Sequence, residues 1–154
     1  ATIADVLREV IHWYEGHGQV FETACCLFPT APFASVQRLT EALTVMNKGS
    51  YDSVFPVLRF SYPIQRALKI EQSKVSMMWP ENLNARSQDL PVAYHDSGQY
   101  YWFKTRQFIE EGTLFMKNSG AVVLNEYEAH DIDSEEDWSI AELKYEYLKK
   151  QGKL

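Results

Sequence analysis

Two aspartates near the end of the chain, Asp131 and Asp133, have the clearest chemical potential, and a single apolar residue separates them. In an extended segment alternate side chains share a face, so both carboxylates are expected to point one way while Ile132 faces the core. Two neighbouring carboxylates with room for water and substrate phosphates suit Mg²⁺. The alternative is that Asp133 only caps the following helix and Asp131 is solvated, because this spacing is a weak motif.

A second group of polar side chains lies between residues 84 and 102. Arg86 has the planar guanidinium that binds a carboxylate or phosphate through two hydrogen bonds. Gln88 and Gln99 offer amide groups that suit the hydroxyl or amide groups of a sugar. His95 is a candidate because histidine is the side chain suited to proton exchange near neutral pH, although a lone histidine is more often structural. We interpret residues 80–97 as a long functional loop.

The composition limits the classes of protein to consider. A chain of 154 residues with 45% apolar residues is long enough for one domain with a buried core. Its net charge of -6 argues against a nucleic-acid partner, and no run approaches the roughly 20 apolar residues of a membrane span. Adjacent Cys25 and Cys26 cannot form a disulfide framework, which favours a reducing, cytoplasmic compartment.

The hydrophobic pattern predicts strands that alternate with helices. Strands are expected at 23–28, 53–60, 99–103 and 122–124, and helices at 3–14, 35–47, 105–111 and 134–149. Residues 67–79 suggest a hairpin, and Pro56 predicts a bulge or an edge in its strand. The alternation predicts an α/β domain with a mostly parallel sheet. Ligands are then expected in the loops after Phe28, Phe60 and Leu124.

Four stretches taken in order carry a resemblance to a known family: LFPTAPF at 27–33, FSYPIQRAL at 60–68, residues 86–89 with 93–102, and DIDSEEDW at 131–138. Together they resemble the acylneuraminate cytidylyltransferases, and most of all the pseudaminic acid cytidylyltransferase branch. The resemblance covers nearly the whole chain. It implies a Rossmann-like fold of the nucleotide-diphospho-sugar transferase type. The implied reaction transfers CMP from CTP to the anomeric hydroxyl of a nine-carbon acidic sugar and releases pyrophosphate.

The resemblance also implies roles for individual residues. Asp131 and Asp133 would be the catalytic pair that holds Mg²⁺ on the nucleotide phosphates, in a cleft shared with Arg86, which would bind the sugar carboxylate. Substrate-binding roles fall on eight residues: Pro29, Thr30, Gln65, Arg66, Arg86, Gln88, His95 and Gln99. The excursion at 63–80 resembles the dimer-forming arm of the family, so a homodimer is expected.

One departure from the family pattern affects the expected activity. Family members open with a strand and a Gly/Arg/Lys-rich loop around the CTP triphosphate, and the 154 residues contain no such loop. We therefore expect residues 1–154 to form one cytidylyltransferase-like domain, N-terminally truncated and inactive alone. The alternative is a non-catalytic sugar-binding or dimerisation module of the same fold, which would bind the sugar without Mg²⁺-dependent binding of CTP. A third alternative is a remnant with no ligand.

Overall fold

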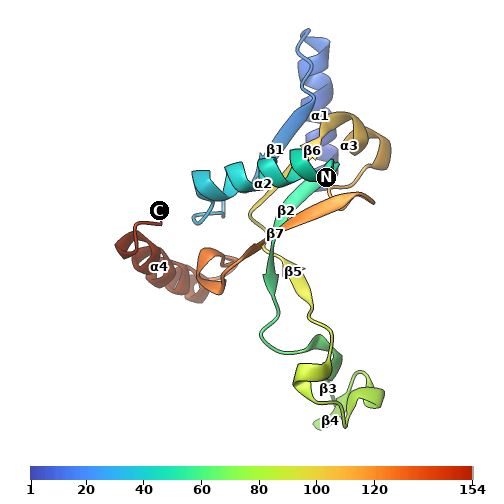
Figure 1. Cartoon of the computed structure of the whole chain (residues 1–154), viewed down its shortest axis with the longest axis vertical. Coiled ribbons are helices and arrows are strands. Elements are labelled where there is room, and N and C mark those ends of the chain that lie inside the picture. Colours follow the sequence, from blue (N-terminus) through green and yellow to red (C-terminus); the bar gives the residue numbers. More distant parts are fainter. Residues whose placement is uncertain (154) are drawn as a thin grey trace.

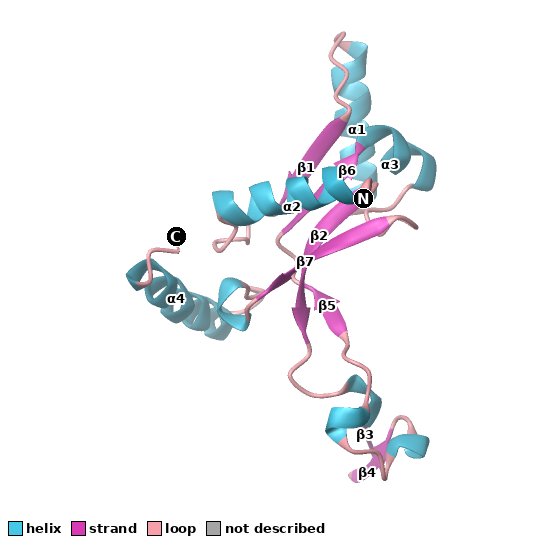
Figure 2. Cartoon of the chain, viewed as in Figure 1, coloured by secondary structure: helices cyan, strands magenta, loops and turns pink. Residues whose placement is uncertain are grey.

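The structure is a computed structural model that describes residues 1–153. Its main sheet has five strands (Figures 1 and 2): β1 (Thr23–Leu27), β2 (Ser53–Arg59), β5 (Tyr94–Asp96), β6 (Tyr100–Lys104) and β7 (Ser119–Leu124). Strand β6 lies between β1 and β2, and β7 pairs with the opposite edge of β2. Strand β5 continues the line of β6, so β2 pairs with both along one edge.

The prediction of a mostly parallel, Rossmann-like sheet is wrong. Among the described residues, four of the five strand pairings are antiparallel, and only β2 and β7 pair in parallel. The reason is the path of the chain after β2, which returns along the same strand through β5 and β6 instead of crossing over through a helix. Strand β6 therefore lies antiparallel between β1 and β2. Strand β6 runs antiparallel to both β1 and β2, so β1 and β2 run in the same direction, and β7 runs with them. The carboxyl ends of these three strands therefore lie at the same end of the sheet.

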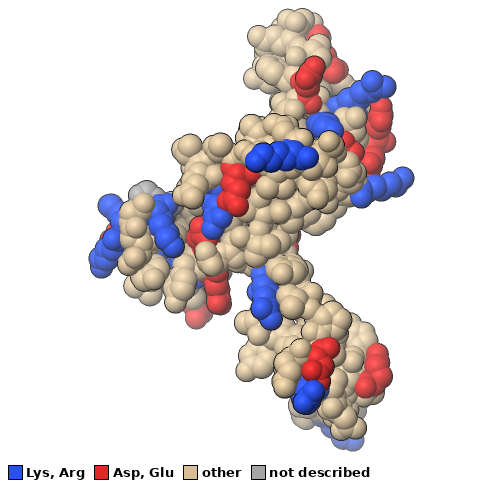
Figure 3. Space-filling model, viewed as in Figure 1, with Lys and Arg blue, Asp and Glu red and all other residues tan. Residues whose placement is uncertain are grey.

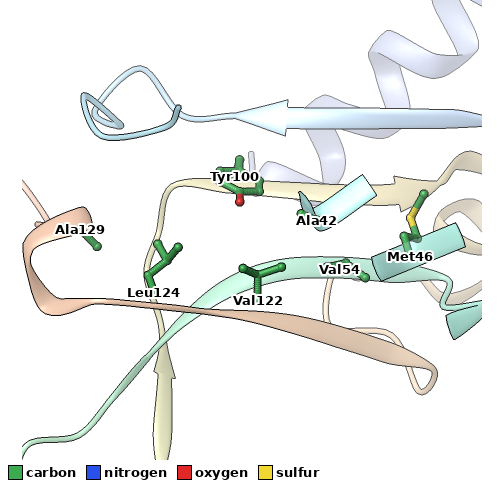
Figure 4. Packing of buried hydrophobic residues seen from close by; sticks show 7 residues of the cluster. All are labelled: Ala42, Met46, Val54, Tyr100, Val122, Leu124 and Ala129. Atoms are coloured by element: carbon green, nitrogen blue, oxygen red, sulfur yellow. The ribbon is translucent and has the colours of Figure 1, made fainter. Parts of the chain in front are cut away.

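Helices cover both faces of this sheet. Helix α2 (Val36–Gly49) lies on one face, while α1 (Ile3–Gly16) and α3 (Thr105–Glu111) lie on the other. Successive side chains of a strand point to opposite faces, so Tyr100 packs under α2 and Tyr101 packs on the other side. The cluster under α2 is seen in Figure 4: Ala42, Met46, Val54, Tyr100, Val122, Leu124 and Ala129.

Pro56 lies inside the sheet, at the point where β2 changes partner. Val54 pairs with Trp102 of β6, and Val57 pairs with Asp96 of β5. Between these two pairs, the backbone nitrogen of Ser97 donates to the carbonyl of Pro56 at 3.2 Å. The ladder is therefore interrupted beside the proline, and the alternative that this strand is an edge is wrong, because β2 has partners on both sides.

The last helix, α4 (Glu135–Lys150), begins as its sequence predicts. The Ser134 hydroxyl accepts from the Asp137 backbone nitrogen at 3.2 Å, and the Asp137 carboxylate accepts from the Ser134 nitrogen at 2.9 Å. This reciprocal capping box satisfies amides that a helix start leaves without partners. The N-cap is therefore Ser134, and the alternative in which Asp133 caps the helix is wrong.

An arm extends from the ends of β2 and β5, away from the sheet (Figure 1). Its tip is a hairpin of β3 (Leu68–Glu71) and β4 (Lys74–Met77), with Gln72 and Ser73 at positive φ in the turn. Short 3₁₀ helices complete the arm: η1 (Ile64–Arg66), η2 (Pro80–Asn82) and η3 (Ser87–Asp89). The predicted hairpin is thus present. Its role in dimerisation and the division of the chain into one domain with an excursion at 63–80 stay predictions.

In the view of Figure 3, acidic and basic side chains are scattered, with no large patch of one sign. Within residues 1–153, no helix combines the length and the apolar character that crossing a membrane needs.

Candidate functional site

A pocket of about 650 Å³ opens where β2 and β7 end, and we call it the strand-end pocket. Its walls come from the end of β2, from β5, from the segment after β7 and from α4. The lining includes Arg59, Phe60, Ser61, His95, Asn125, Glu126, His130, Asp131 and Lys144. Two of the three loops expected to hold the ligand, those after Phe60 and Leu124, therefore meet in one hollow.

The acid pair lies on the exposed segment just before α4. Ile132 is half-buried and packs against the cluster of Phe33, Ala141 and Leu148, whereas Asp131 and Asp133 are both exposed. The apolar side chain is thus turned inward, as expected, and the shared direction of the two carboxylates stays a prediction. Asp131 lines the strand-end pocket, but Asp133 is not among its lining residues.

The segment that leads to Asp131 is anchored by an ion pair. The Arg38 guanidinium on α2 donates to both oxygens of the Glu128 carboxylate, at 2.9 and 2.8 Å. Asn125 also donates to this carboxylate, from its backbone nitrogen at 3.1 Å and its side-chain amide at 2.7 Å. These hydrogen bonds, led by those from Arg38, lower the pKa of Glu128 to about 2. The short helix η4 (Glu126–Glu128) is thus fixed against α2.

Gln99, expected to bind substrate, lies behind the same segment. Its side chain is buried, and its amide nitrogen donates to the Glu128 carbonyl at 2.7 Å. Its carbonyl oxygen has no hydrogen-bond partner within residues 1–153. Gln99 therefore supports the backbone next to the pocket and is not in the pocket lining.

His95, in contrast, lines the strand-end pocket. Its ring lies 4.8 Å from the Phe60 ring, and its Nδ1 lies 2.8 Å from the Asp96 carbonyl. A carbonyl only accepts, so Nδ1 carries the hydrogen, and Nε2 of the neutral ring is left as an acceptor. His95 and Asp131 are thus two expected site residues that the structure brings to one pocket.

The expected substrate loop after β1 borders a different pocket. Pro29 and Thr30 line a hollow of about 810 Å³ whose other wall is α4, including Trp138 and Tyr145. Ile132 belongs to this second lining, and its neighbour Asp131 belongs to the first. The acid-pair segment therefore separates two pockets, each bordered by expected site residues.

The remaining expected substrate residues lie on the arm. Arg86 is 72% exposed and donates to the Asp89 carboxylate at 2.7 Å. Arg66 lies 3.4 Å from the Ala85 carbonyl, and Gln65 donates to the Pro91 carbonyl at 3.1 Å. Gln88 is exposed. None of the four lines the pocket that contains Asp131, so a single chain does not bring Arg86 into the cleft expected for the acid pair.

Two cationic residues of the strand-end pocket were missed by reasoning from the sequence. Arg59 ends β2, and its exposed side chain makes no hydrogen bond within the described residues. A lone arginine at the carboxyl end of an apolar strand was the available signal. Lys144 lies in the middle of α4, where a lysine usually faces water, and its half-buried position depends on how α4 packs.

The expected magnesium ion would be held by carboxylate oxygens, which Mg²⁺, Ca²⁺ and Mn²⁺ all accept as ligands. Two exposed carboxylates, Asp131 and Asp133, offer oxygen ligands and leave positions for water and phosphate, which suits Mg²⁺. Residues 1–153 contain no group of three or more His, Cys, Asp or Glu able to hold a metal. Burial raises the pKa of the Cys25 thiol to about 11, which fits an inert thiol.

Comparison with known proteins gives the family. No family model matches the chain. It is 32% identical over 146 residues to pseudaminic acid cytidylyltransferase of Campylobacter jejuni, covering 94% of this chain and 63% of that protein. It is 30% identical over 142 residues to N-acylneuraminate cytidylyltransferase A of Danio rerio, covering 90% of this chain and 31% of that protein. The chain thus spans less than two thirds of the length of these curated relatives. These relatives place the chain in the sialic-type cytidylyltransferase family.

Proposed function

We propose that the chain serves the transfer of CMP from CTP to the anomeric hydroxyl of a nine-carbon acidic sugar, pseudaminic acid or another sialic-type acid, with release of pyrophosphate. The observation that carries the proposal is Asp131 in a pocket with His95 and Arg59, at the shared carboxyl end of β2 and β7. Relatives named as pseudaminic acid and N-acylneuraminate cytidylyltransferases supply the reaction class.

Asp131 and Asp133 would hold Mg²⁺. When bound, this ion neutralises charge on the nucleotide phosphates and on the leaving pyrophosphate. The protein's part would be to present two carboxylates outward from one short segment, and the inward packing of Ile132 supports this. The anchoring of η4 by Arg38 limits the freedom of this segment, and so supports a fixed ligand geometry.

The strand-end pocket suits an acidic sugar. Arg59 supplies a guanidinium with no partner inside the described chain, and a carboxylate is its natural ligand. Ser61 and His95 line the same hollow, and a hydroxyl and the His95 Nε2 acceptor match the hydroxyl and amide groups of such a sugar. The fit to a polar, anionic ligand supports this part of the proposal.

The protein is proposed to act as a homodimer joined through the arm. Leu68, Ile70 and Val75 of the hairpin are all largely exposed, with Ile70 at 73%. A second copy would cover them. The arm of the second copy would also bring its Arg86 toward the strand-end pocket of the first copy, because the first copy's own Arg86 does not reach that pocket. In such a dimer, Arg86 of one copy and Asp131 of the other copy would belong to the same site.

Calorimetry on the 154-residue chain tests the proposal. Mn²⁺, as a probe for Mg²⁺, should bind to the chain and lose most of its affinity in Asp131→Asn, while pseudaminic acid should bind without metal. Glu9→Gln, which changes an exposed carboxylate on α1, is the matched control and should bind Mn²⁺ as the unchanged chain does.

Two outcomes decide against the proposal. Sugar binding with no metal binding and no Mg²⁺-dependent CTP binding would indicate a non-catalytic sugar-binding module. Absence of binding by sugar and by metal would contradict the proposed function altogether.

A further inference from the structure

Lys144 of α4 makes its contacts with the segment that precedes the acid pair. Its ammonium donates to the Glu126 carbonyl at 2.8 Å and to the Ala129 carbonyl at 2.9 Å. Its third close partner is Nδ1 of His130, at 3.4 Å. A lysine ammonium has three donors, so all of them are directed at the five residues just before Asp131. Burial lowers the pKa of Lys144, and the nearby Glu126 carboxylate opposes that shift.

His130 connects Lys144 to the start of the same helix. Because Nδ1 faces a donor, the neutral ring carries its hydrogen on Nε2. That Nε2 is buried without a hydrogen-bond partner in the described residues, and Oδ1 of Asp137 lies 3.7 Å from it. Asp137 and Lys144 are seven residues apart, two turns of α4, and therefore lie on one face of the helix.

Asp137 in turn holds the segment on the other side of the acid pair. Its carboxylate accepts from the backbone nitrogens of Asp133, at 3.2 Å, and Ser134, at 2.9 Å. One face of α4 thus binds the chain before Asp131 through Lys144 and after it through Asp137. Between these two attachments the acid-pair segment has little freedom to change its direction.

We propose that Lys144 is a positioning residue that holds the backbone of residues 126–130 against α4 and so directs Asp131 into the strand-end pocket. For its effect on metal binding, the inference rests on the proposed function above. The contacts themselves do not depend on it. Lys144 does not need to touch a substrate or an ion, because two carbonyl contacts suffice to fix the segment that carries the carboxylate.

Two substitutions distinguish the hydrogen bonds of the Lys144 ammonium from the packing of its apolar stem. Lys144→Met keeps the apolar stem of the side chain and removes all three donors, whereas Lys144→Arg keeps a cationic donor. Lys149→Met, at an exposed position of the same helix, is the matched control. In Lys144→Met we expect faster amide hydrogen exchange over residues 126–134, with α2 and α3 protected as before. We also expect about 10-fold weaker Mn²⁺ binding, as for the loss of groups that orient metal ligands.

Lys144→Arg should recover most of the protection and of the affinity, and Lys149→Met should change neither. Unchanged exchange over residues 126–131 in Lys144→Met would overturn the inference. So would equal loss of Mn²⁺ affinity in Lys144→Met and Lys149→Met. If the unchanged chain binds no Mn²⁺, the proposed role of the acid pair fails, and the exchange data alone then decide whether Lys144 holds the segment.

Discussion

The Arg38 guanidinium and the Glu128 carboxylate meet side by side, with Nε 2.9 Å from Oε1 and Nη2 2.8 Å from Oε2. The two residues are 90 positions apart in the sequence. Their pairing joins α2, which covers one face of the sheet, to the segment that leads from β7 to Asp131. The stability of the domain and the geometry of the candidate site therefore both depend on this contact.

The pair makes the stability of the domain depend on pH. Folding lowers the pKa of Glu128 from 4.5 to about 2, so its contribution is complete above about pH 4.5 and is lost as the pH falls toward 2. Glu128→Gln should lower the free energy of unfolding at pH 7 by about 2 kcal/mol. The difference from the unchanged chain should shrink between pH 4.5 and 2, as measured by urea unfolding at several pH values.

The control for this prediction is an ion pair on the surface. Arg106 and Glu110 of α3 meet at 3.1 Å, with the arginine side chain 85% exposed. Glu110→Gln should change the free energy of unfolding by less than about 0.5 kcal/mol. Equal effects of the two substitutions would show that the Glu128 contact has no special role.

Arg59→Ala should weaken binding of the acidic sugar to the chain. Loss of hydrogen bonds to a carboxylate predicts a dissociation constant raised about 10- to 100-fold. Arg106→Ala, which removes an exposed arginine outside the strand-end pocket, should leave the constant unchanged. Titration calorimetry with pseudaminic acid measures both, and equal affinities for the two variants would remove Arg59 from the site.

Ile70→Glu should separate the proposed dimer. A charge on the exposed hairpin would be buried against a second copy, and that burial is unfavourable. Light scattering should give a mass near 17.8 kDa for this variant and twice that for the unchanged chain. Val36→Glu, at an apolar position of α2 that is 81% exposed, should stay dimeric. A monomeric unchanged chain would contradict the arm's assigned role.

Phe108→Ala should strongly destabilise the face of the sheet covered by α1 and α3. Phe108 is fully buried and lies 5.0 Å from Phe103, ring centre to ring centre. Removal of a buried phenylalanine ring predicts a loss of about 3–5 kcal/mol. Phe115→Ala, where the side chain is largely exposed, should cost far less. Thermal unfolding of both variants checks the order, and similar midpoints would contradict the described packing.

Local signals in the sequence were enough to predict most of the elements. Ser134 followed by Asp137 marks the start of α4, and the alternation around Ile132 predicts which side chains turn inward, because both effects act within a few residues. The sequence also places loops after Phe60 and Leu124, and the structure pairs the two strands before them, β2 and β7, in parallel. From these ends the structure brings Asp131 and His95 into one pocket.

Only the tertiary structure decided the order of the sheet, because a strand chooses its partner through contacts between distant residues. Tyr100 to Lys104 form a strand on local grounds, but nothing near them says that this strand lies antiparallel between β1 and β2. The same reason separates Arg86 from Asp131 and places Lys144 beside the Ala129 carbonyl. Each of these positions depends on how elements far apart in the chain pack together, which residue type and spacing do not encode locally.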